Sequence, residues 1–321
     1  MRMTAIAGLA TLLIWPQAAH ADGSRASATA FGARDLSGLW TSASLTDLER
    51  TAGAKALVLS DAEAAAYERR RPDEFMAEGG GGGVSARAMN YGWWALPKRL
   101  ARIDGKARTS WIVDPPDGRL PYSAAGLAAR ARALAETSDA RGPEGRMPAE
   151  RCLLAAWGTA GPPMLNGPYS NLYQIAQTKD EVAIFMEANH DVRFIRLNAR
   201  GHLPAHIRPW MGDTLGRWEG KTLVAETTNF NPGDAIKAPT QLYISKDAKV
   251  TERFTRVAAD RLLYEFEVED RATFTQTWRA QMVFEPAKGP ILEYACHEGN
   301  YSLSGILAGA RQEEAAQRPS K

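Results

Sequence analysis

The second half of the chain alternates apolar and polar residues in short runs. In the segment from Leu262 to Val268, Tyr264 and Phe266 continue one apolar face, while Glu265 and Glu267 fall on the other. This period of two predicts a strand with one buried and one solvated face. Similar runs, separated by turn sequences, lie at 171–177, 181–187, 192–197, 216–218, 222–230, 249–257, 262–268, 274–284 and 291–296. Roughly eight short strands with hairpin-length connections predict an antiparallel sandwich or barrel, and a closed barrel leaves no edge strand.

The first half is irregular and carries two helix patterns. In the segment 59–71, Ser60 precedes Glu63 by three residues, which is the capping box of a helix start. The segment 123–136 is alanine-rich and predicts a second short helix. Short strands are expected at 35–40, where Trp40 would plug a barrel, and at 109–113, before the turn sequence DPPDG. The glycine run 79–83 predicts a loop.

The chain begins like an exported protein. Arg2 precedes an apolar run, and Ala19-His20-Ala21 resembles a signal-peptidase site, so residues 1–21 are expected to be a signal peptide. The apolar run is shorter than the ~20 residues of a membrane span, which disfavours a retained anchor. We expect a flexible tether at 22–34, a single barrel domain at 35–311 and a disordered polar tail at 312–321. This organisation predicts a periplasmic or secreted protein.

Charge and missing motifs exclude several function classes. Lys plus Arg number 39 against 37 Asp plus Glu, without a basic stripe, so nucleic acid is not an expected partner. Nine tryptophans and nine tyrosines suit a β-rich fold or a site for flat apolar molecules. The sequence lacks the nucleophile elbow, the Walker A loop, the dinucleotide fingerprint, the haem motif and the EF-hand loop. No cofactor is therefore expected, and the pattern leaves the oligomeric state open.

Cys152 and Cys296 are the only cysteines. In an oxidising compartment they are expected to form a disulfide, which would stabilise the fold by ~3–5 kcal/mol. The alternative is a free, nucleophilic Cys296 followed by His297 and Glu298.

Histidines beside carboxylates are the candidate catalytic groups. His190 lies at a predicted hairpin turn, and Asp191 would either orient it as a general base or cap the turn. His297 and Glu298 form a second such pair, although a bend is needed to bring them together. Arg193 or Arg208 would hold an anionic oxygen.

Aromatic residues are the candidate ligand-binding groups. Those expected to line an apolar cavity, together with His202, are Trp210, Trp218, Trp278, Tyr294 and Tyr301. For Trp218 and Trp278 the alternative is a place in the core. The spacing from His202 to His206 would suit a metal pair on a helix, but Pro204 lies between them, so no metal is expected there.

Several long strings carry a resemblance. They are RTSWIVDPPDGRLP (108–121), ERCLLAAWGTAGPPMLNGPYSNLYQI (150–175), HLPAHIRPWMGDTLGRWEGKTLVAETTNF (202–230), ERFTRV (252–257) and EYACHEGNY (293–301). In order and over about residues 35–311, the chain resembles a family of exported, largely uncharacterised bacterial proteins of soil proteobacteria and acidobacteria. The resemblance implies a lipocalin-like β-barrel in the periplasm and assigns no catalytic residue. His206 departs from the Leu-Pro-Pro-Ser that often follows the first histidine in that family.

We therefore expect a mainly β protein, a lipocalin-like antiparallel barrel of about eight strands with two short helices and an irregular N-terminal half. It would bind and transform a small, mainly apolar molecule (aromatic, terpenoid or steroid-like) by cofactor-free acid/base chemistry of the lyase, isomerase or hydratase type. One alternative is a non-catalytic carrier. Another is a metal-assisted hydrolase built on His190, His202 and His297.

Overall fold

The structure is a computed structural model, which describes residues 31–51, 53–77, 97–137, 141–155, 158–167, 169–237 and 240–317. The predicted signal peptide (1–21), most of the predicted tether and the glycine run 79–83 lie outside the described residues. Within the described ranges, no helix has the length and apolar character needed to cross a membrane.

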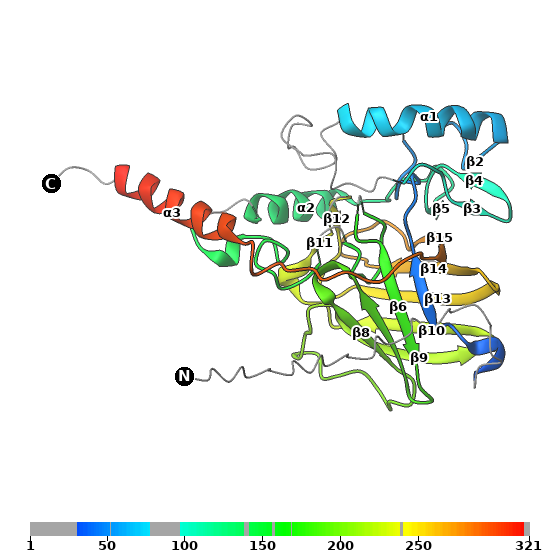
Figure 1. The fold of residues 1–321 in the computed structure, drawn as a ribbon. Coiled ribbons are helices and arrows are strands. Elements are labelled where there is room, and N and C mark those ends of the chain that lie inside the picture. Colours follow the sequence, from blue (N-terminus) through cyan, green and yellow to red (C-terminus); the bar gives the residue numbers. More distant parts are fainter. Residues whose placement is uncertain are drawn as a thin grey trace, which may run out of the picture.

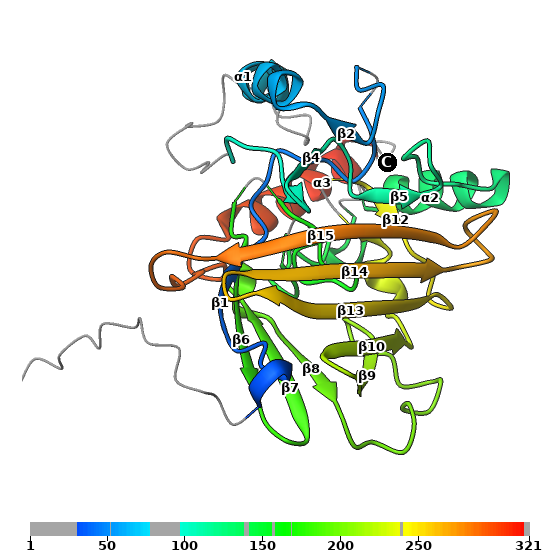
Figure 2. The ribbon, with the colours of Figure 1, turned by 90° about the vertical axis from the view of Figure 1, so that its right-hand side faces the viewer.

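Nine strands of the described chain close into a barrel (Figures 1 and 2). In barrel order they are β1 (Gly38–Thr41), β6 (Leu172–Gln177), β7 (Glu181–Met186), β8 (Val192–Arg196), β9 (Asp213–Glu219), β10 (Thr222–Thr228), β13 (Lys249–Ala258), β14 (Arg261–Glu269) and β15 (Trp278–Pro286). β15 returns to β1 through the pairs Trp40 with Pro286 and Thr41 with Glu285. A tenth strand of the sheet, β5 (Ile112–Asp114), also pairs with β15. The predicted barrel is confirmed.

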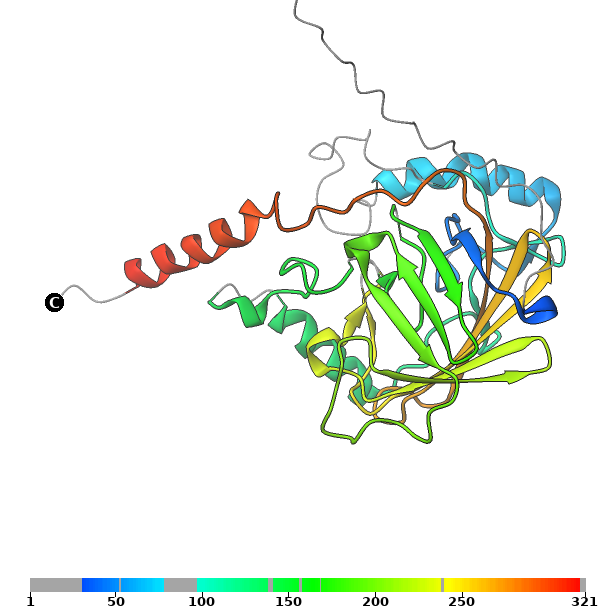
Figure 3. The ribbon, with the colours of Figure 1, turned by 60° about the horizontal axis from the view of Figure 1, so that its bottom comes forward.

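Two details of the barrel differ from the prediction. It has nine strands instead of about eight, and it is mixed, because β8 and β9 run parallel and pair through Arg196 and Leu215. Residues 291–296, predicted as a strand, are not part of a sheet. They belong to an extended segment, here called the strap (residues 287–300), which leads from β15 to the C-terminal helix (Figure 3).

Alternate residues of each strand fill the barrel, as the period of two predicted. Leu262, Tyr264, Phe266 and Val268 of β14 are at most 2% exposed. Trp278 is fully buried and meets Phe266 edge to face, with ring centroids 5.6 Å apart. Each such side chain contributes about 1.5–3 kcal/mol through burial, so the interior is a packed core.

The predicted tryptophan plug is present where the chain enters β1. Trp40 is 2% exposed, its indole N–H donates to the carbonyl of Leu36 at 3.0 Å, and the guanidinium of Arg256 lies 5.2 Å from its ring centroid. A second plug is the loop 158–167, whose residues Thr159, Met164 and Leu165 are at most 1% exposed. Loop and strands therefore share one core.

Three helices lie outside the barrel in the described part of the chain (Figure 1). They are α1 (Asp61–Ala77), α2 (Ala124–Glu136) and α3 (Tyr301–Ala316). The capping box of α1 is confirmed, since the carboxylate of Glu63 accepts from the backbone N–H of Ser60 at 2.9 Å. The N-cap of α2 is Ser123, which accepts from Gly126 N at 2.9 Å.

The third helix was not predicted. The polar tail was expected to be disordered from residue 312, but α3 continues to Ala316, because Asn300 caps its start and the sequence is rich in alanine. α3 points away from the barrel (Figures 1 and 3).

In the described ranges, the remaining short elements build two small sheets and four turns of 3₁₀ helix. β2 (Val58–Leu59), β4 (Lys106–Arg108) and β3 (Arg102–Ile103) form one sheet, and β11 (Ile236–Lys237) pairs with β12 (Leu242–Tyr243) in the other. The 3₁₀ turns are η1 (Gly32–Arg34), η3 (Pro143–Gly145), η5 (Ala188–His190) and η6 (Pro232–Asp234).

Candidate functional site

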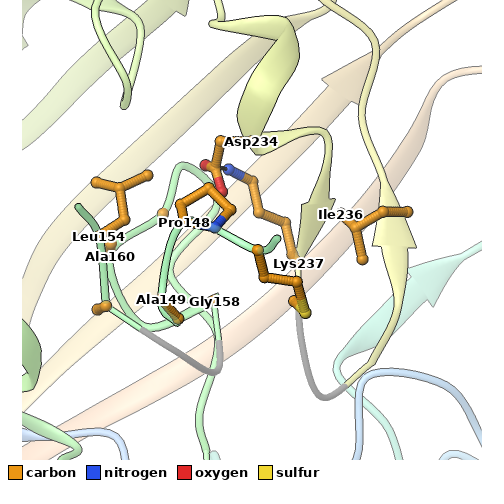
Figure 4. Close-up of a pocket in the computed structure, with 11 residues that line it drawn as sticks. Pro148, Ala149, Leu154, Gly158, Ala160, Asp234, Ile236 and Lys237 are labelled. Atoms are coloured by element: carbon orange, nitrogen blue, oxygen red, sulfur yellow. Dashed lines mark hydrogen bonds and ion pairs between the residues drawn. The ribbon is translucent and has the colours of Figure 1, made fainter. Parts of the chain in front are cut away.

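A pocket beside β11 brings a lysine and an aspartate together among apolar residues (Figure 4). We call it the Lys237 pocket. Its lining is Met147, Pro148, Ala149, Leu154, Ala155, Gly158, Ala160, Gly161, Asp234, Ile236 and Lys237. The free space inside is about 20 Å³, enough for one water molecule.

Local hydrogen bonds place the two charged residues. Asn231 caps η6 by accepting from Gly233 N at 2.9 Å, which fixes the turn that carries Asp234. Lys237 follows in β11, opposite Leu242 of β12. Arg130 of α2 donates to the carbonyl of Gln241 at 2.8 Å and so ties this hairpin to the helix.

The ammonium of Lys237 donates to the carboxylate of Asp234 within the pocket. The side chain of Lys237 is 4% exposed and that of Asp234 is 12% exposed. Burial raises the pKa of Asp234, and the neighbouring Lys237 opposes that rise. A charged pair removed from water loses much hydration, which makes this pair a candidate site.

A second carboxylate supports the wall of the pocket. Asp191 accepts from the backbone N–H of Ala155 at 2.6 Å and from the side-chain amide of Asn189 at 3.1 Å. Burial raises the pKa of Asp191, and the charge of Asp234 adds to the rise. The two carboxylates therefore influence each other although they come from different loops.

Tyr294, a residue of the strap, interacts with Asp191. Burial raises its pKa to about 12, and a hydrogen bond with Tyr169 and the charge of Asp191 act in the same direction. Tyr294 therefore keeps its proton at neutral pH.

The disulfide predicted between Cys152 and Cys296 is confirmed, with an S–S distance of 2.02 Å. It joins the loop that walls the pocket to the strap. Asn300 strengthens the junction by donating to the carbonyl of Glu150 at 2.8 Å. Neither cysteine is free, so the alternative of a nucleophilic Cys296 is wrong.

His190 borders a different depression, here called the outer groove. It is open, measures about 1000 Å³, and is lined by Ser37, Gly38, Leu39, Gln174, Ile175, Ala176, Gln177, Phe185, His190, Pro290, Ile291, Leu292 and Glu293. The His190 ring stacks on Phe185, and its Nε2 accepts from Tyr294 N at 2.9 Å. His190 therefore holds the strap. Asp191 does not orient the His190 imidazole, as was predicted, and instead accepts hydrogen bonds from Ala155 and Asn189.

The other predicted catalytic residues are dispersed. His297 and Glu298 are exposed in the turn after the disulfide. Arg208 donates to the carbonyls of Phe230 at 3.2 Å and Lys246 at 2.5 Å. Arg193 lies inside the barrel, 3% exposed.

Arg193 belongs to a closed polar network. It donates to both oxygens of Glu252, at 3.0 and 2.5 Å, and Glu252 also accepts from the hydroxyl of Tyr264 at 2.7 Å. That hydroxyl in turn accepts from Met164 N at 2.9 Å. The network fastens the loop 158–167 to the barrel.

The predicted ligand-binding residues do not share one cavity. Trp278 is in the core, and Trp218 is partly buried against it, with Arg34 5.8 Å from its ring centroid. Trp210 is half-buried beside Gly233, and Tyr301 is 81% exposed. None of the predicted set lines the Lys237 pocket.

His202 forms a separate cluster on the outer face of the barrel. Its Nδ1 lies 2.9 Å from Asp213, which also accepts from Leu203 N at 2.9 Å and from Arg196 at 2.6 Å. Burial alone would raise the pKa of Asp213, but these hydrogen bonds outweigh it and lower the pKa. Nε2 of His202 lies 3.6 Å from Glu226 and is buried without a hydrogen-bond partner.

The histidines do not assemble a metal site. His190 contacts the strap, His202 contacts Asp213, and His297 is exposed beyond the disulfide. In the described ranges, no group of three or more His, Cys, Asp or Glu side chains is placed to hold a metal ion.

Sequence reasoning missed Asp234 and Lys237. They stand in the polar stretch NPGDAIK (231–237), which is typical of a surface turn. One signal could have located them. Ile236-Lys237 precedes a second short apolar run, and two such runs are typical of a hairpin. Burial of the pair depends on the loop 147–161, more than seventy residues earlier in the chain.

The chain matches no protein-family model, and no curated protein matches it significantly. The resemblance to exported proteobacterial and acidobacterial barrels therefore stays a prediction.

Proposed function

We propose that this protein acts outside the cytoplasm, where it binds a small, mainly apolar molecule in the Lys237 pocket together with an adjoining cavity of about 100 Å³, and transforms it by cofactor-free acid/base chemistry. The reaction would be of the lyase, isomerase or hydratase type. The disulfide supports a periplasmic or secreted location, because such bonds persist in oxidising compartments.

The buried Lys237–Asp234 pair is the observation that carries the proposal. The rest of the lining is apolar or glycine, so the pair is the polar feature that would orient a ligand. A general base works best when its pKa lies near the operating pH. Burial moves the pKa of Asp234 in that direction.

The chemistry follows from the two side chains. The carboxylate of Asp234 would remove a proton from the carbon beside a carbonyl group. The ammonium of Lys237 would donate to the carbonyl oxygen and stabilise the negative charge that develops on it. The charge of Asp234 adds to the raised pKa of Asp191, and the charge of Asp191 adds to the pKa of about 12 at Tyr294.

Proton exchange tests this role without knowledge of the natural substrate. Small ketones such as cyclohexanone would be incubated with the full, disulfide-bonded chain in D₂O, and loss of the α-proton signal followed by NMR. We expect exchange above the buffer rate and a loss of about 10²–10⁴-fold in Asp234→Asn. Asp247→Asn is the matched control, because Asp247 pairs with Lys246 at the surface, where it is 61% exposed. Equal exchange in both variants would refute the role of Asp234.

A carrier is the second candidate, favoured by the outer groove. Its apolar lining and open shape suit an apolar ligand that is held without reaction. In that case N-phenylnaphthylamine should bind, Phe185→Ala should weaken binding, and Asp234→Asn should leave it unchanged. The α-proton exchange of small ketones would then not exceed the buffer rate.

A further inference from the structure

We propose that Lys237 forms a covalent imine with its substrate, which is therefore an aldehyde or ketone with an apolar substituent. This inference rests on the proposed function of the Lys237 pocket. It assigns to the lysine a bond to the carbonyl carbon in place of a hydrogen bond to the oxygen.

The position of Lys237 meets the main requirement of an imine-forming lysine, which is an amine removed from water next to a proton acceptor. The side chain is 4% exposed, and Asp234 lies in direct contact. An ammonium group cannot attack a carbonyl, so the proton must first leave. Asp234 is the group in contact that can take it. The raised pKa of Asp234 supports this transfer.

The steps balance within the pocket. Asp234 takes one proton from the Lys237 ammonium, and the free amine adds to the carbonyl carbon. The second amine proton moves to the former carbonyl oxygen and gives a carbinolamine. Asp234 then returns its proton to this hydroxyl group, which leaves as water. A protonated imine faces the restored carboxylate, so one ammonium and one carbonyl have become one iminium and one water.

The shape of the pocket restricts the substrate. The space beside the amine is about 20 Å³, which matches the water that must leave and later return for hydrolysis of the imine. An adjoining cavity of about 100 Å³ shares the walls Met147, Pro148 and Ile236. Methionine side chains adapt easily, so Met147 can make way for a substituent that reaches from one space into the other. Glu136, Glu144 and Arg146 also line the second cavity, so charges of both signs surround the space for the substituent.

Reductive trapping tests the imine. The full, disulfide-bonded chain would be incubated with butyraldehyde and sodium cyanoborohydride at neutral pH, and each modified lysine located by peptide mass spectrometry. Lys246 is the matched control, because it also pairs with an aspartate but is 52% exposed. Simple accessibility predicts that Lys246 reacts faster. If Lys237 forms the imine, it is labelled faster than Lys246. Asp234→Asn then slows the labelling of Lys237 by about tenfold or more, because the proton acceptor is lost.

Two results separate this inference from the proposed function. If wild-type Lys237 is labelled no faster than Lys246, the imine is refuted, even where ketone exchange still depends on Asp234. If the α-proton exchange of ketones is also absent, the proposed function is refuted as well. Lys237→Arg adds a check, since arginine keeps the positive charge but forms no imine. An imine-dependent exchange is lost in this variant, whereas a purely electrostatic one is retained in part.

Discussion

Removal of Arg193 from β8 should destabilise this protein far more than removal of Arg253, an exposed arginine of β13. In Arg193→Met, Glu252 loses two of its three hydrogen bonds and keeps only that from Tyr264. Because the two charged side chains are 2% and 0% exposed, water cannot replace the lost partner. We expect a loss of about 3–5 kcal/mol in the free energy of unfolding.

The matched control is Arg253→Met. Arg253 pairs with Glu219 at 2.8 Å, but both side chains are over 40% exposed. This substitution should cost less than about 1 kcal/mol. The double variant Arg193→Met/Glu252→Gln should recover much of the loss, since a glutamine carries no charge and still accepts from Tyr264.

The assay is urea unfolding of the disulfide-bonded chain, followed by tryptophan fluorescence and circular dichroism. The four chains of the cycle give the coupling energy between Arg193 and Glu252, which we expect to exceed about 2 kcal/mol. If Arg193→Met costs no more than Arg253→Met, or if the second substitution adds to the damage, the reasoning about the buried charge is wrong.

Three further predictions concern the disulfide, one carboxylate and one glycine. Cys152→Ser/Cys296→Ser opens a loop of 144 residues and should cost up to about 5 kcal/mol in urea unfolding; an unchanged midpoint would contradict this. Because the folded pKa of Asp191 is raised, the native state binds that proton more tightly than the unfolded chain, so stability should decline as pH rises from about 4 towards the folded pKa. Asp191→Asn should remove this part of the decline. If the free energy of unfolding of the variant and of the wild type changes with pH in parallel, the prediction is wrong. Gly126→Ala should destabilise by about 1–3 kcal/mol, because its Cβ would lie 1.9 Å from the carbonyl oxygen of Thr273, whereas Gly305→Ala in α3 meets open space and should be neutral or stabilising, as thermal unfolding would show.

Much of the barrel could be predicted because the strand pattern is local. Each barrel strand from β6 to β15 shows its buried face in its own sequence, and the turns of the hairpins β6–β7, β7–β8, β9–β10 and β13–β14 are short. The parallel pairing of β8 with β9 could not be predicted in this way, because it depends on the path of a sixteen-residue connection (197–212). The segment 291–296 has strand-like residues, but no neighbouring strand pairs with it. What holds it is the disulfide and His190.

The candidate site was harder to predict than the fold. Cys152 and Cys296 were identifiable because they are the only cysteines and the chain begins like an exported protein. Asp234 and Lys237 were not, since an aspartate and a lysine in a turn are normally solvated. Their burial results from contacts with a distant loop, and a pattern of local periodicity contains no information about such contacts.

The closed network around Arg193 also bears on how such a protein can diversify. With the lumen occupied by its own side chains, the barrel wall supplies stability, and the pocket is built from loop and hairpin residues such as Ala155, Ala160 and Ile236. Substitutions there change what fits beside Lys237 while the sequences of the nine barrel strands stay the same. Under the proposed function, selection for a new substrate would act on a few connections while the scaffold stays constant, as it does in the loops of barrel enzymes.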